Sequence, residues 1–306
     1  MKLGFLFPGQ GSQSVGMGKD LYEKYEEVRN IYDKVKEITG IDIAKNTFDG
    51  PEEVLNETKY TQLAILTMSL GILEILNKKG IKADISSGLS LGEYTALIYS
   101  KALSLEDGIK LVQKRGQYMG ELVPKGEWLM AAILGMDEAQ VEEVCKRVTK
   151  GFVVPANFNT TGQIVISGEK EAVEEAEIIA KELGAKKVRV LKTAGPFHTK
   201  KLEDASSAYR KELEVVEFND FETTVIKNLD GIEYKKEDNV KDILEKHIIS
   251  PVRFSNGLQT MINLGVDTFV EIGPGKALSG FVKRIETDKE ITILNINNAE
   301  SLEMLK

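Results

Sequence analysis

The sequence of 306 residues has few of the residues that build cross-links and metal sites. It contains one cysteine, Cys145, and two histidines, His198 and His247. A single cysteine excludes an internal disulfide framework and fits a reducing compartment, so we expect a cytoplasmic protein. No group of His and Cys has the spacing of a metal site, and we expect no metal. The two histidines also leave only two candidates for an imidazole base.

Long hydrophobic runs and excess positive charge are absent as well. The longest apolar run, Leu63 to Leu76, is about one-third too short to span a bilayer and contains Glu74. The N-terminus lacks a basic segment followed by a long apolar one, so we expect neither a signal peptide nor a membrane partner. A net charge of −8 argues against nucleic acid as the main partner. What remains is the composition of an ordinary globular protein.

The order of the apolar segments predicts a mixed α/β fold. Short apolar runs bounded by turn residues are typical of buried strands in a parallel sheet. Such runs occur at residues 2–7, 83–87, 224–228 and 268–271. A long apolar helix is expected over residues 60–76.

A second pattern occupies residues 128–191. Its segments alternate as strand, helix, strand, strand, helix, strand, which is the order of a ferredoxin-like βαββαβ unit. We therefore expect one large α/β domain, formed by residues 1–126 and 194–306, with a ferredoxin-like insert at residues 127–193.

The segment Gly88-Leu89-Ser90-Leu91-Gly92 joins a predicted strand to a predicted helix. This is the G-x-S-x-G pattern of a nucleophile elbow, in which glycines permit a sharp turn that lifts a serine hydroxyl clear of the sheet. The helix N-terminus that follows favours negative charge, which suits acyl transfer. The alternative is a glycine-rich turn with an incidental serine.

A serine hydroxyl needs a base to act as a nucleophile at neutral pH. His198 follows the Gly195-Pro196 turn at a domain boundary, where clefts form, and is our candidate base. A surface-loop histidine is the alternative. His247 lies at the end of a predicted helix, and we expect its side chain to be a helix-end histidine favoured by the helix dipole.

Arg115 is the third candidate. It lies on an expected helix that begins after Ser104, in a stripe with Leu111, Tyr118 and Leu122. A guanidinium among apolar neighbours is costly to bury unless it is paired. Two explanations stay open: a structural ion pair with a buried carboxylate, or a bidentate site for a substrate carboxylate.

Seven segments in this order resemble one family. They are Phe7-Pro8-Gly9-Gln10-Gly11-Ser12-Gln13, Gly88-Leu89-Ser90-Leu91-Gly92-Glu93, Gln113-Lys114-Arg115-Gly116, Asn157-Phe158-Asn159, Pro196-Phe197-His198, Ser250-Pro251-Val252-Arg253 and Gly273-Pro274-Gly275-Lys276. Over essentially the whole chain the sequence resembles malonyl-CoA:acyl carrier protein transacylases of fatty-acid synthesis.

The resemblance implies an α/β-hydrolase-like core with a ferredoxin-like insert and an enzyme that needs no cofactor. It implies Ser90 as the acylated nucleophile, His198 as general base and acid, and Arg115 as the group that binds the malonyl carboxylate. The backbone N–H groups of Gln10 and Leu91 would form the oxyanion hole. A backbone carbonyl just before the Ser250-Pro251 segment would orient the histidine.

Further substrate contacts are expected from Phe197, which would disfavour branched acyl groups, and from Asn157 and His247. Two positions depart from the family pattern. Leu89 replaces the usual histidine of the elbow, and His247 replaces the usual glutamine. Neither change removes the proposed nucleophile or base.

The implied partners are malonyl-CoA and an acidic acyl carrier protein. Local positive charge for docking is expected from Lys200, Lys201, Lys283 and Arg284, and a monomer is expected. One rival function is a serine esterase or thioesterase of the α/β-hydrolase class. There the histidine lies near the C-terminus, whereas more than a hundred residues follow His198 here. The other rival is a catalytically silent module that binds carrier proteins.

Overall fold

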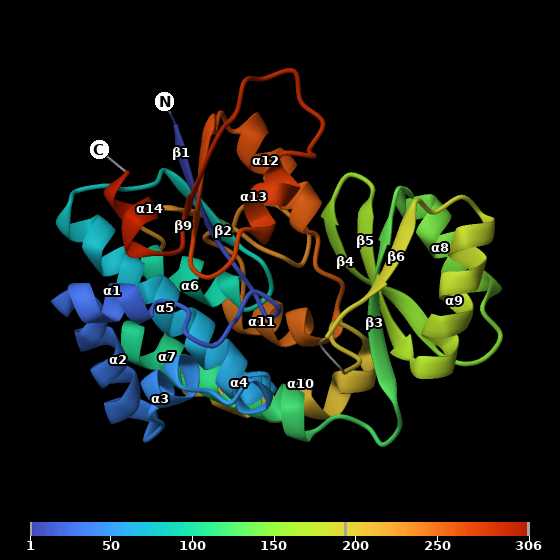
Figure 1. The fold of residues 1–306 in the computed structure, drawn as a ribbon, viewed down its shortest axis with the longest axis horizontal. Helices are drawn as coiled ribbons and strands as arrows, with labels where there is room; N and C mark the ends of the chain where they lie inside the picture. The colour runs from blue at the N-terminus through green and yellow to red at the C-terminus, as the bar shows by residue number, and fades with distance from the viewer. Residues whose placement is uncertain (1, 193–194, 305–306) are drawn as a thin grey trace.

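A computed structural model describes residues 2–192 and 195–304 of the chain. Figure 1 shows two parts side by side: a larger one built on a parallel sheet with helices around it, and a smaller one built on a second sheet. The predicted α/β fold class is therefore confirmed.

The parallel sheet has the strand order β7-β2-β1-β8-β9. Its strands are β1 (Leu3–Phe7), β2 (Ile85–Gly88), β7 (Thr224–Ile226), β8 (Thr268–Ile272) and β9 (Thr292–Ile296). The central strands are buried on both faces, as is usual for a parallel sheet covered by helices. β1 pairs with β2 so that Phe7 lies opposite Gly88. The loops that leave these two strands therefore start side by side at one edge of the sheet.

Helices of the larger part surround this sheet (Figure 1). They are α1 (Lys19–Lys24), α2 (Glu26–Thr39), α3 (Ile43–Phe48), α4 (Glu52–Leu55), α5 (Thr58–Lys78), α6 (Gly92–Tyr99), α7 (Leu105–Glu121), α10 (Glu203–Glu214), α11 (Val240–Ile249), α12 (Phe254–Asn263), α13 (Ala277–Val282) and α14 (Ala299–Glu303), with a 3₁₀ turn at Lys200–Leu202.

The long helix α5 extends beyond the predicted residues 60–76 at both ends. Within the described residues it is the one helix that by length and composition could cross a membrane. However, 83% of its most apolar window is buried inside the fold. Its apolar surface is thus covered by protein, and it packs against α2 and α7 as the central helix of the core.

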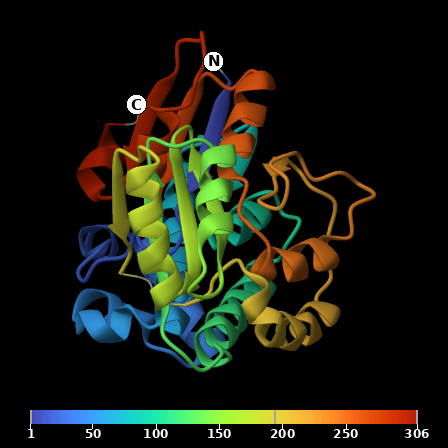
Figure 2. The ribbon, with the colours of Figure 1, turned by 90° about the vertical axis from the view of Figure 1, so that its right-hand side faces the viewer.

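The smaller part is an antiparallel sheet of order β4-β5-β3-β6. It comprises β3 (Trp128–Leu134), α8 (Glu138–Arg147), β4 (Val153–Thr160), β5 (Gln163–Glu169), α9 (Lys170–Glu182) and β6 (Lys187–Val190). Figure 2 shows α8 and α9 covering its outer face. The predicted βαββαβ order is observed. The proposed end of the insert at residue 193 lies outside the described residues.

A short backbone pairing joins the two parts beside the cleft between them. The amide of Val252, after α11, donates to the carbonyl of Ala156, and the amide of Phe158 donates to the carbonyl of Val252. Strand β4 is thereby fixed against the segment that follows α11.

Capping residues in the sequence correctly predicted where two helices begin, but one strand was not predicted. The predicted cap at Ser104 is present, because its hydroxyl accepts the Asp107 amide at the start of α7. Asp137 caps α8 in the same way. Strand β9 was not predicted. It is an edge strand in which two of five residues are exposed, although three of the five, Ile293, Leu294 and Ile296, are apolar.

Candidate active site

The elbow at Ser90 has the strained backbone that its sequence predicts. Ser90 has φ +54°, a left-handed conformation that is costly for a residue with a β-carbon. The two glycines around it are required by close packing. A β-carbon on Gly88 would lie 1.9 Å from the carbonyl carbon of Gly92, and one on Gly92 would lie 2.0 Å from the Phe7 carbonyl oxygen. The turn therefore fits between β1 and α6 only with glycine at both positions.

His198 lies against this serine although 108 residues separate them. The Oγ of Ser90 is 2.8 Å from Nε2 of His198, and Nδ1 of His198 is 3.0 Å from the backbone carbonyl of His247. A carbonyl oxygen can only accept, so Nδ1 carries the proton and Nε2 is free to accept from Ser90. The pair predicted from sequence is thus in hydrogen-bond contact, with the imidazole oriented by a backbone carbonyl in the last turn of α11.

Burial keeps this imidazole neutral. His198 is 4% exposed, and burial, together with the nearby charge of Arg115, lowers its pKa from 6.5 to about 4. A neutral imidazole is the form that can accept a proton from a hydroxyl.

Arg115 is 1% exposed and reaches the same hydroxyl. Its Nη2 donates to Ser90 Oγ at 3.0 Å, and its Nη1 donates to Oε1 of Gln62 at 2.7 Å. Among the described residues no carboxylate forms an ion pair with it, and its Nε has no partner. The structural ion pair that the sequence left open is therefore not found. A buried cation beside a nucleophile, with no carboxylate in direct contact, fits an anionic ligand.

Two backbone amides lie free next to the elbow. A β-carbon on Gly9 would come within 2.3 Å of the Leu89 carbonyl oxygen, so the loop after β1 packs tightly on the elbow. In residues 2–192 and 195–304, the N–H groups of Gln10 and Leu91 have no hydrogen-bond partner. One unpaired donor at the N-terminus of α6 and one in the adjacent loop after β1 are what an oxyanion hole requires.

A cavity of about 110 Å³ opens onto Ser90 and His198. It is lined by Gly9, Gln10, Gln62, Leu89, Ser90, Met119, Met130, Asn157, Asn159, Val165, Leu191, Phe197 and His198. The predicted contacts Asn157 and Phe197 thus line the same cavity as the nucleophile. Leu89, which departs from the family pattern, also faces it.

The expectation for the His247 side chain is wrong. His247 does lie in the last turn of α11, as predicted, but its ring is fully buried and stacks on His198 with 5.1 Å between ring centroids. Burial first, and then the neighbouring His198 and Arg115, hold its pKa well below 6.5, so the helix dipole does not keep it protonated. Nor does it line the cavity. Its ring lies behind His198, whereas its carbonyl is the group that orients the base.

Two residues that the sequence did not identify hold this site together. The side chain of Asn228 accepts the Ser90 amide at 2.7 Å and donates to the Gly88 carbonyl at 2.6 Å, so it binds both arms of the elbow. Gln62 holds Arg115 in place. A polar amide on an otherwise apolar helix could have identified Gln62, but the sequence around Asn228 carries no comparable signal.

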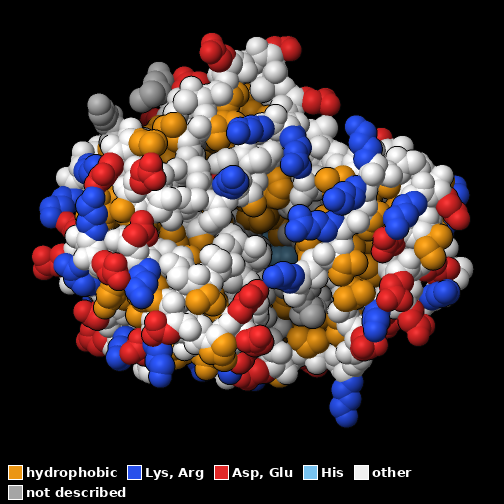
Figure 3. Space-filling view, viewed as in Figure 1, with side chains coloured by type: hydrophobic (Ala, Val, Ile, Leu, Met, Phe, Trp, Pro, Cys, Tyr) orange, Lys and Arg blue, Asp and Glu red, His pale blue; other side chains and the backbone are white. Residues whose placement is uncertain are grey.

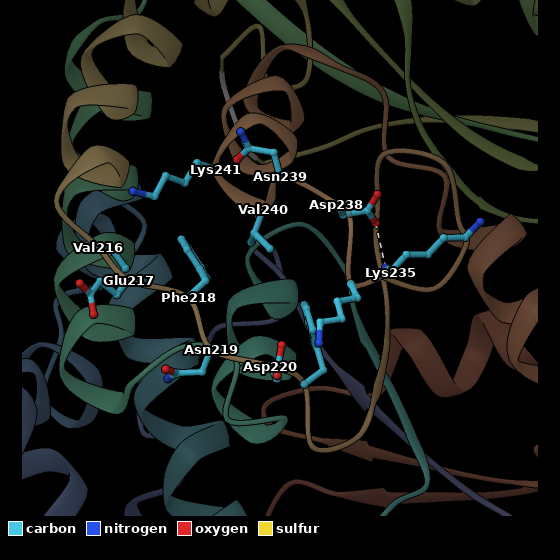
Figure 4. Close-up of a pocket in the computed structure, with 12 residues that line it drawn as sticks. Val216, Glu217, Phe218, Asn219, Asp220, Lys235, Asp238, Asn239, Val240 and Lys241 are labelled. Carbon is cyan, nitrogen blue, oxygen red and sulfur yellow. Dashed lines mark hydrogen bonds between the residues drawn. The ribbon is translucent and has the colours of Figure 1, made fainter.

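Nothing in the described residues suggests a metal centre, because no group of three or more His, Cys, Asp or Glu side chains could hold an ion. A larger hollow of about 430 Å³ lies between residues 216–221 and 235–241, and includes none of the predicted site residues. Figure 4 shows the side chains that line it, and there the amide of Lys235 donates to Asp238. It holds no nucleophile or base beside an acyl-binding group, so the smaller cavity is the candidate active site.

Replacing Asn228 with leucine tests whether the strained serine is held by that side chain. The change leaves the Ser90 amide and the Gly88 carbonyl without partners, and we expect a loss of about 2–4 kcal/mol in the free energy of unfolding. Labelling of Ser90 by a sulfonyl fluoride, followed by intact mass, should slow by at least about tenfold. Asn219→Leu, on an exposed loop, is the matched control. Equal labelling rates in both variants would contradict the role of Asn228.

Comparisons with known proteins agree with this site. The family model described as "Acyl transferase domain" matches residues 4–300. The malonyl CoA-acyl carrier protein transacylase of Bacillus subtilis is 40% identical over 305 residues, which cover 99% of this chain and 96% of that protein. The crystal structure of the transacylase of the same name from Clostridium perfringens has a TM-score of 0.94 and 46% identity, covering 99% of this chain and 96% of that one.

A third relative was solved with a partner. It is a malonyl-transacylase in complex with a type II PKS acyl-carrier protein, with a TM-score of 0.94, 34% identity, and coverage of 99% of this chain and 98% of that one. Matches of this extent, across sequence and structure, establish the family. The chain belongs to the acyl transferase family and groups with the malonyl CoA-acyl carrier protein transacylases.

Proposed function

We propose that this protein transfers a malonyl group from CoA to the phosphopantetheine thiol of an acyl carrier protein, through a malonyl ester on Ser90, in fatty-acid biosynthesis. The observation that carries the proposal is the buried Arg115 guanidinium, which has no carboxylate within ion-pair distance among the described residues and lies 3.0 Å from the Ser90 hydroxyl. The names of the relatives support the same substrate pair.

In the first half-reaction Ser90 Oγ attacks the thioester carbon while His198 Nε2 takes its proton. The oxyanion that forms is bound by the Gln10 and Leu91 amides, and one such donor is typically worth about 2.7–4 kcal/mol. The carbon–sulfur bond then breaks, and CoA thiolate leaves with the proton from His198. In the second half-reaction the carrier-protein thiol attacks the malonyl ester by the reverse route. The acyl group changes partners without any redox step, so no cofactor is required.

Substrate binding would also strengthen the base. The charge of Arg115 is one of the two causes that lower the pKa of His198 in the free protein. A malonyl carboxylate bound to Arg115 neutralises that charge and lets the imidazole accept a proton more readily. An acetyl group lacks the carboxylate and leaves the base weak. Selection for malonyl is therefore expected in the rate of acylation as well as in binding.

The rival functions have less support. A general ester hydrolase does not need a buried arginine beside its serine, whereas Arg115 donates to Ser90 Oγ here. The imidazole is oriented by a backbone carbonyl instead of the carboxylate of a hydrolase triad. A silent binding module would have no reason to keep a strained serine in contact with a histidine. We further propose that the protein acts as a monomer in the cytoplasm, which its single cysteine supports.

Replacing Arg115 with alanine tests the proposed function. We expect kcat/KM for malonyl-CoA to fall by about 10²–10³, because a charged contact in a buried site is worth roughly 3–4 kcal/mol. Activity with acetyl-CoA should rise, since the empty site no longer holds an unpaired cation. Both substrates are assayed side by side for transfer to carrier protein. Arg210→Ala, at a half-buried ion-pair cluster that is not part of the candidate site, is the control. Equal losses with both substrates would refute the role of Arg115 in selecting malonyl.

Phe197 is proposed to exclude branched acyl groups. Its ring is 5% exposed, lines the cavity next to His198, and packs over Gly195. Phe197→Ser should raise the ratio of methylmalonyl to malonyl transfer by about tenfold, the usual value of one methyl group in a fitted pocket. The ratio is measured with the two CoA esters in competition. An unchanged ratio means that another wall of the cavity sets this limit.

Docking of an acidic carrier protein requires local positive charge on a chain of net charge −8. Lys200, Lys201, Lys283 and Arg284 are all exposed. Lys201 lies over the Phe152 ring before β4, whereas Arg284 donates to Gln163 at the start of β5. The two pairs therefore flank opposite ends of the β4–β5 hairpin. Figure 3 shows lysine and arginine side chains gathered over α13 and the adjoining end of the second sheet, the side of Lys283 and Arg284.

Separate charge reversal at each pair tests this docking proposal. Changing Lys283 and Arg284 to glutamate should raise the KM for carrier protein by about three- to tenfold at low salt, and the effect should shrink at high salt. The variant with Lys200 and Lys201 both changed to glutamate is compared with it. The KM for malonyl-CoA is measured in the same variants to separate docking from acylation. If neither pair changes the carrier-protein KM, docking uses another surface.

A further inference from the structure

A buried carboxylate lies behind the candidate base and is not used in the mechanism above. Glu93, in the first turn of α6, is fully buried. Its Oε1 accepts the hydroxyl of Tyr234 at 2.6 Å, and its Oε2 accepts the amide of Asn228 at 3.3 Å. These contacts satisfy a carboxylate, but they do not explain why an ionisable group occupies the position.

The His247 ring connects this carboxylate to the base. Its Nδ1 lies 3.2 Å from Oε2 of Glu93, and its ring stacks on His198 at an interplanar angle of 28°. The contact with Glu93 is close but is not aligned as a hydrogen bond, and neither ring nitrogen has a partner among the described residues. His247 thus forms a neutral, polarisable layer between the carboxylate and the imidazole that must become positive.

The base requires such a negative group. Burial and Arg115 both disfavour the imidazolium on His198. Its Nδ1 is bound by a carbonyl, which carries no net charge. When Nε2 takes the Ser90 proton, a full positive charge forms in a site without any other carboxylate close to the ring in the described structure.

We propose that Glu93, acting through the neutral ring of His247, is the counter-charge of the imidazolium that forms on His198, and is therefore a positioning residue for acyl transfer. The proposal rests on the proposed function. In a Ser-His-Asp triad the carboxylate both orients the histidine and stabilises its positive charge. Here the backbone carbonyl of His247 orients His198, and the carboxylate of Glu93 stabilises the charge. His247, where the family usually has glutamine, is the side chain that transmits the effect.

The ionisation of Glu93 gives the proposal a testable pH dependence. Burial raises the pKa of Glu93 from 4.5 to about 7, against hydrogen bonds from Tyr234 and Asn228 and the charge of Arg115, which lower it. The carboxyl is therefore neutral below about pH 7 and ionised above it. Titratable or charged groups face it from each neighbouring element: His247 from α11, Arg115 from α7, Tyr94 from α6, and Asp230 and Tyr234 from the segment after β7.

Two measurements on the full-length protein test the proposal. The first is the pH profile of kcat/KM for acylation by malonyl-CoA, which reports ionisations of the free enzyme. Wild type should gain about tenfold as pH rises through 7, the size expected for one charge acting within a buried cluster. Glu93→Gln should lose this step and fall to the low-pH rate. Tyr234→Phe removes a hydrogen bond that favours the ionised form, so it should move the step to higher pH without abolishing it.

The second measurement follows the imidazole NMR signals of the two histidines, which the sequence makes simple to assign. In wild type both neutral rings should show a small shift with a midpoint near pH 7, too small for ring protonation, and Glu93→Gln should abolish it. His247→Gln should keep the rate step but reduce its size. If Glu93→Gln does not fold, Tyr234→Phe and His247→Gln still decide the matter.

The outcomes separate this proposal from the proposed function. A rate loss of equal size at every pH, or imidazole signals that do not change between pH 6 and 8, would overturn the counter-charge and leave a structural carboxylate. If malonyl-CoA does not acylate Ser90 at all, the proposed function fails. The NMR step then still shows whether Glu93 acts on the base.

Discussion

The structure depends on one interaction, the contact between a buried guanidinium and the hydroxyl of a strained serine. Arg115 is removed from water, held by Gln62 and Ser90, and left without a carboxylate in direct contact among the described residues. Burying an unpaired charge costs several kcal/mol, so the arrangement is stable only because the rest of the fold imposes it. The same cost makes the site selective, because an anionic acyl group supplies the missing counter-charge at the place where the nucleophile stands.

The fold positions these side chains by fixing the backbone segments that carry them. Parallel pairing of β1 and β2 brings the loop of Gln10 beside the elbow, and glycines let the two segments approach within contact distance. Asn228 then binds both arms of the elbow, and the carbonyl of His247 fixes the imidazole. The positions of the nucleophile and the base are thus fixed by hydrogen bonds to backbone atoms in separate segments of the chain. This explains how a site formed by residues far apart in the chain can keep fixed geometry without a ligand.

Sequence predicted the parts of this site that local pattern encodes. Glycine spacing identified Ser90, the count of two histidines restricted the base, and the apolar stripe on α7 marked Arg115 as unusual. Sequence could not predict Asn228 or Glu93 as members of the site, because their contacts join residues 135–141 positions apart. The His247 side chain was assigned wrongly because helix position does not reveal burial: the same helix end can face solvent or the core. Strand β9 was also missed, although Ile293, Leu294 and Ile296 give it an apolar sequence.

The most direct test of this account is peptide mapping by tandem mass spectrometry after the protein is mixed with malonyl-CoA and quenched in acid. The account predicts a malonyl group on Ser90, removed by subsequent addition of holo-acyl carrier protein, and no adduct in Ser90→Ala. Release of free malonate without an adduct would instead indicate a hydrolase. An adduct on another residue, or no reaction, would contradict the convergence of serine, histidine and arginine on one acyl group.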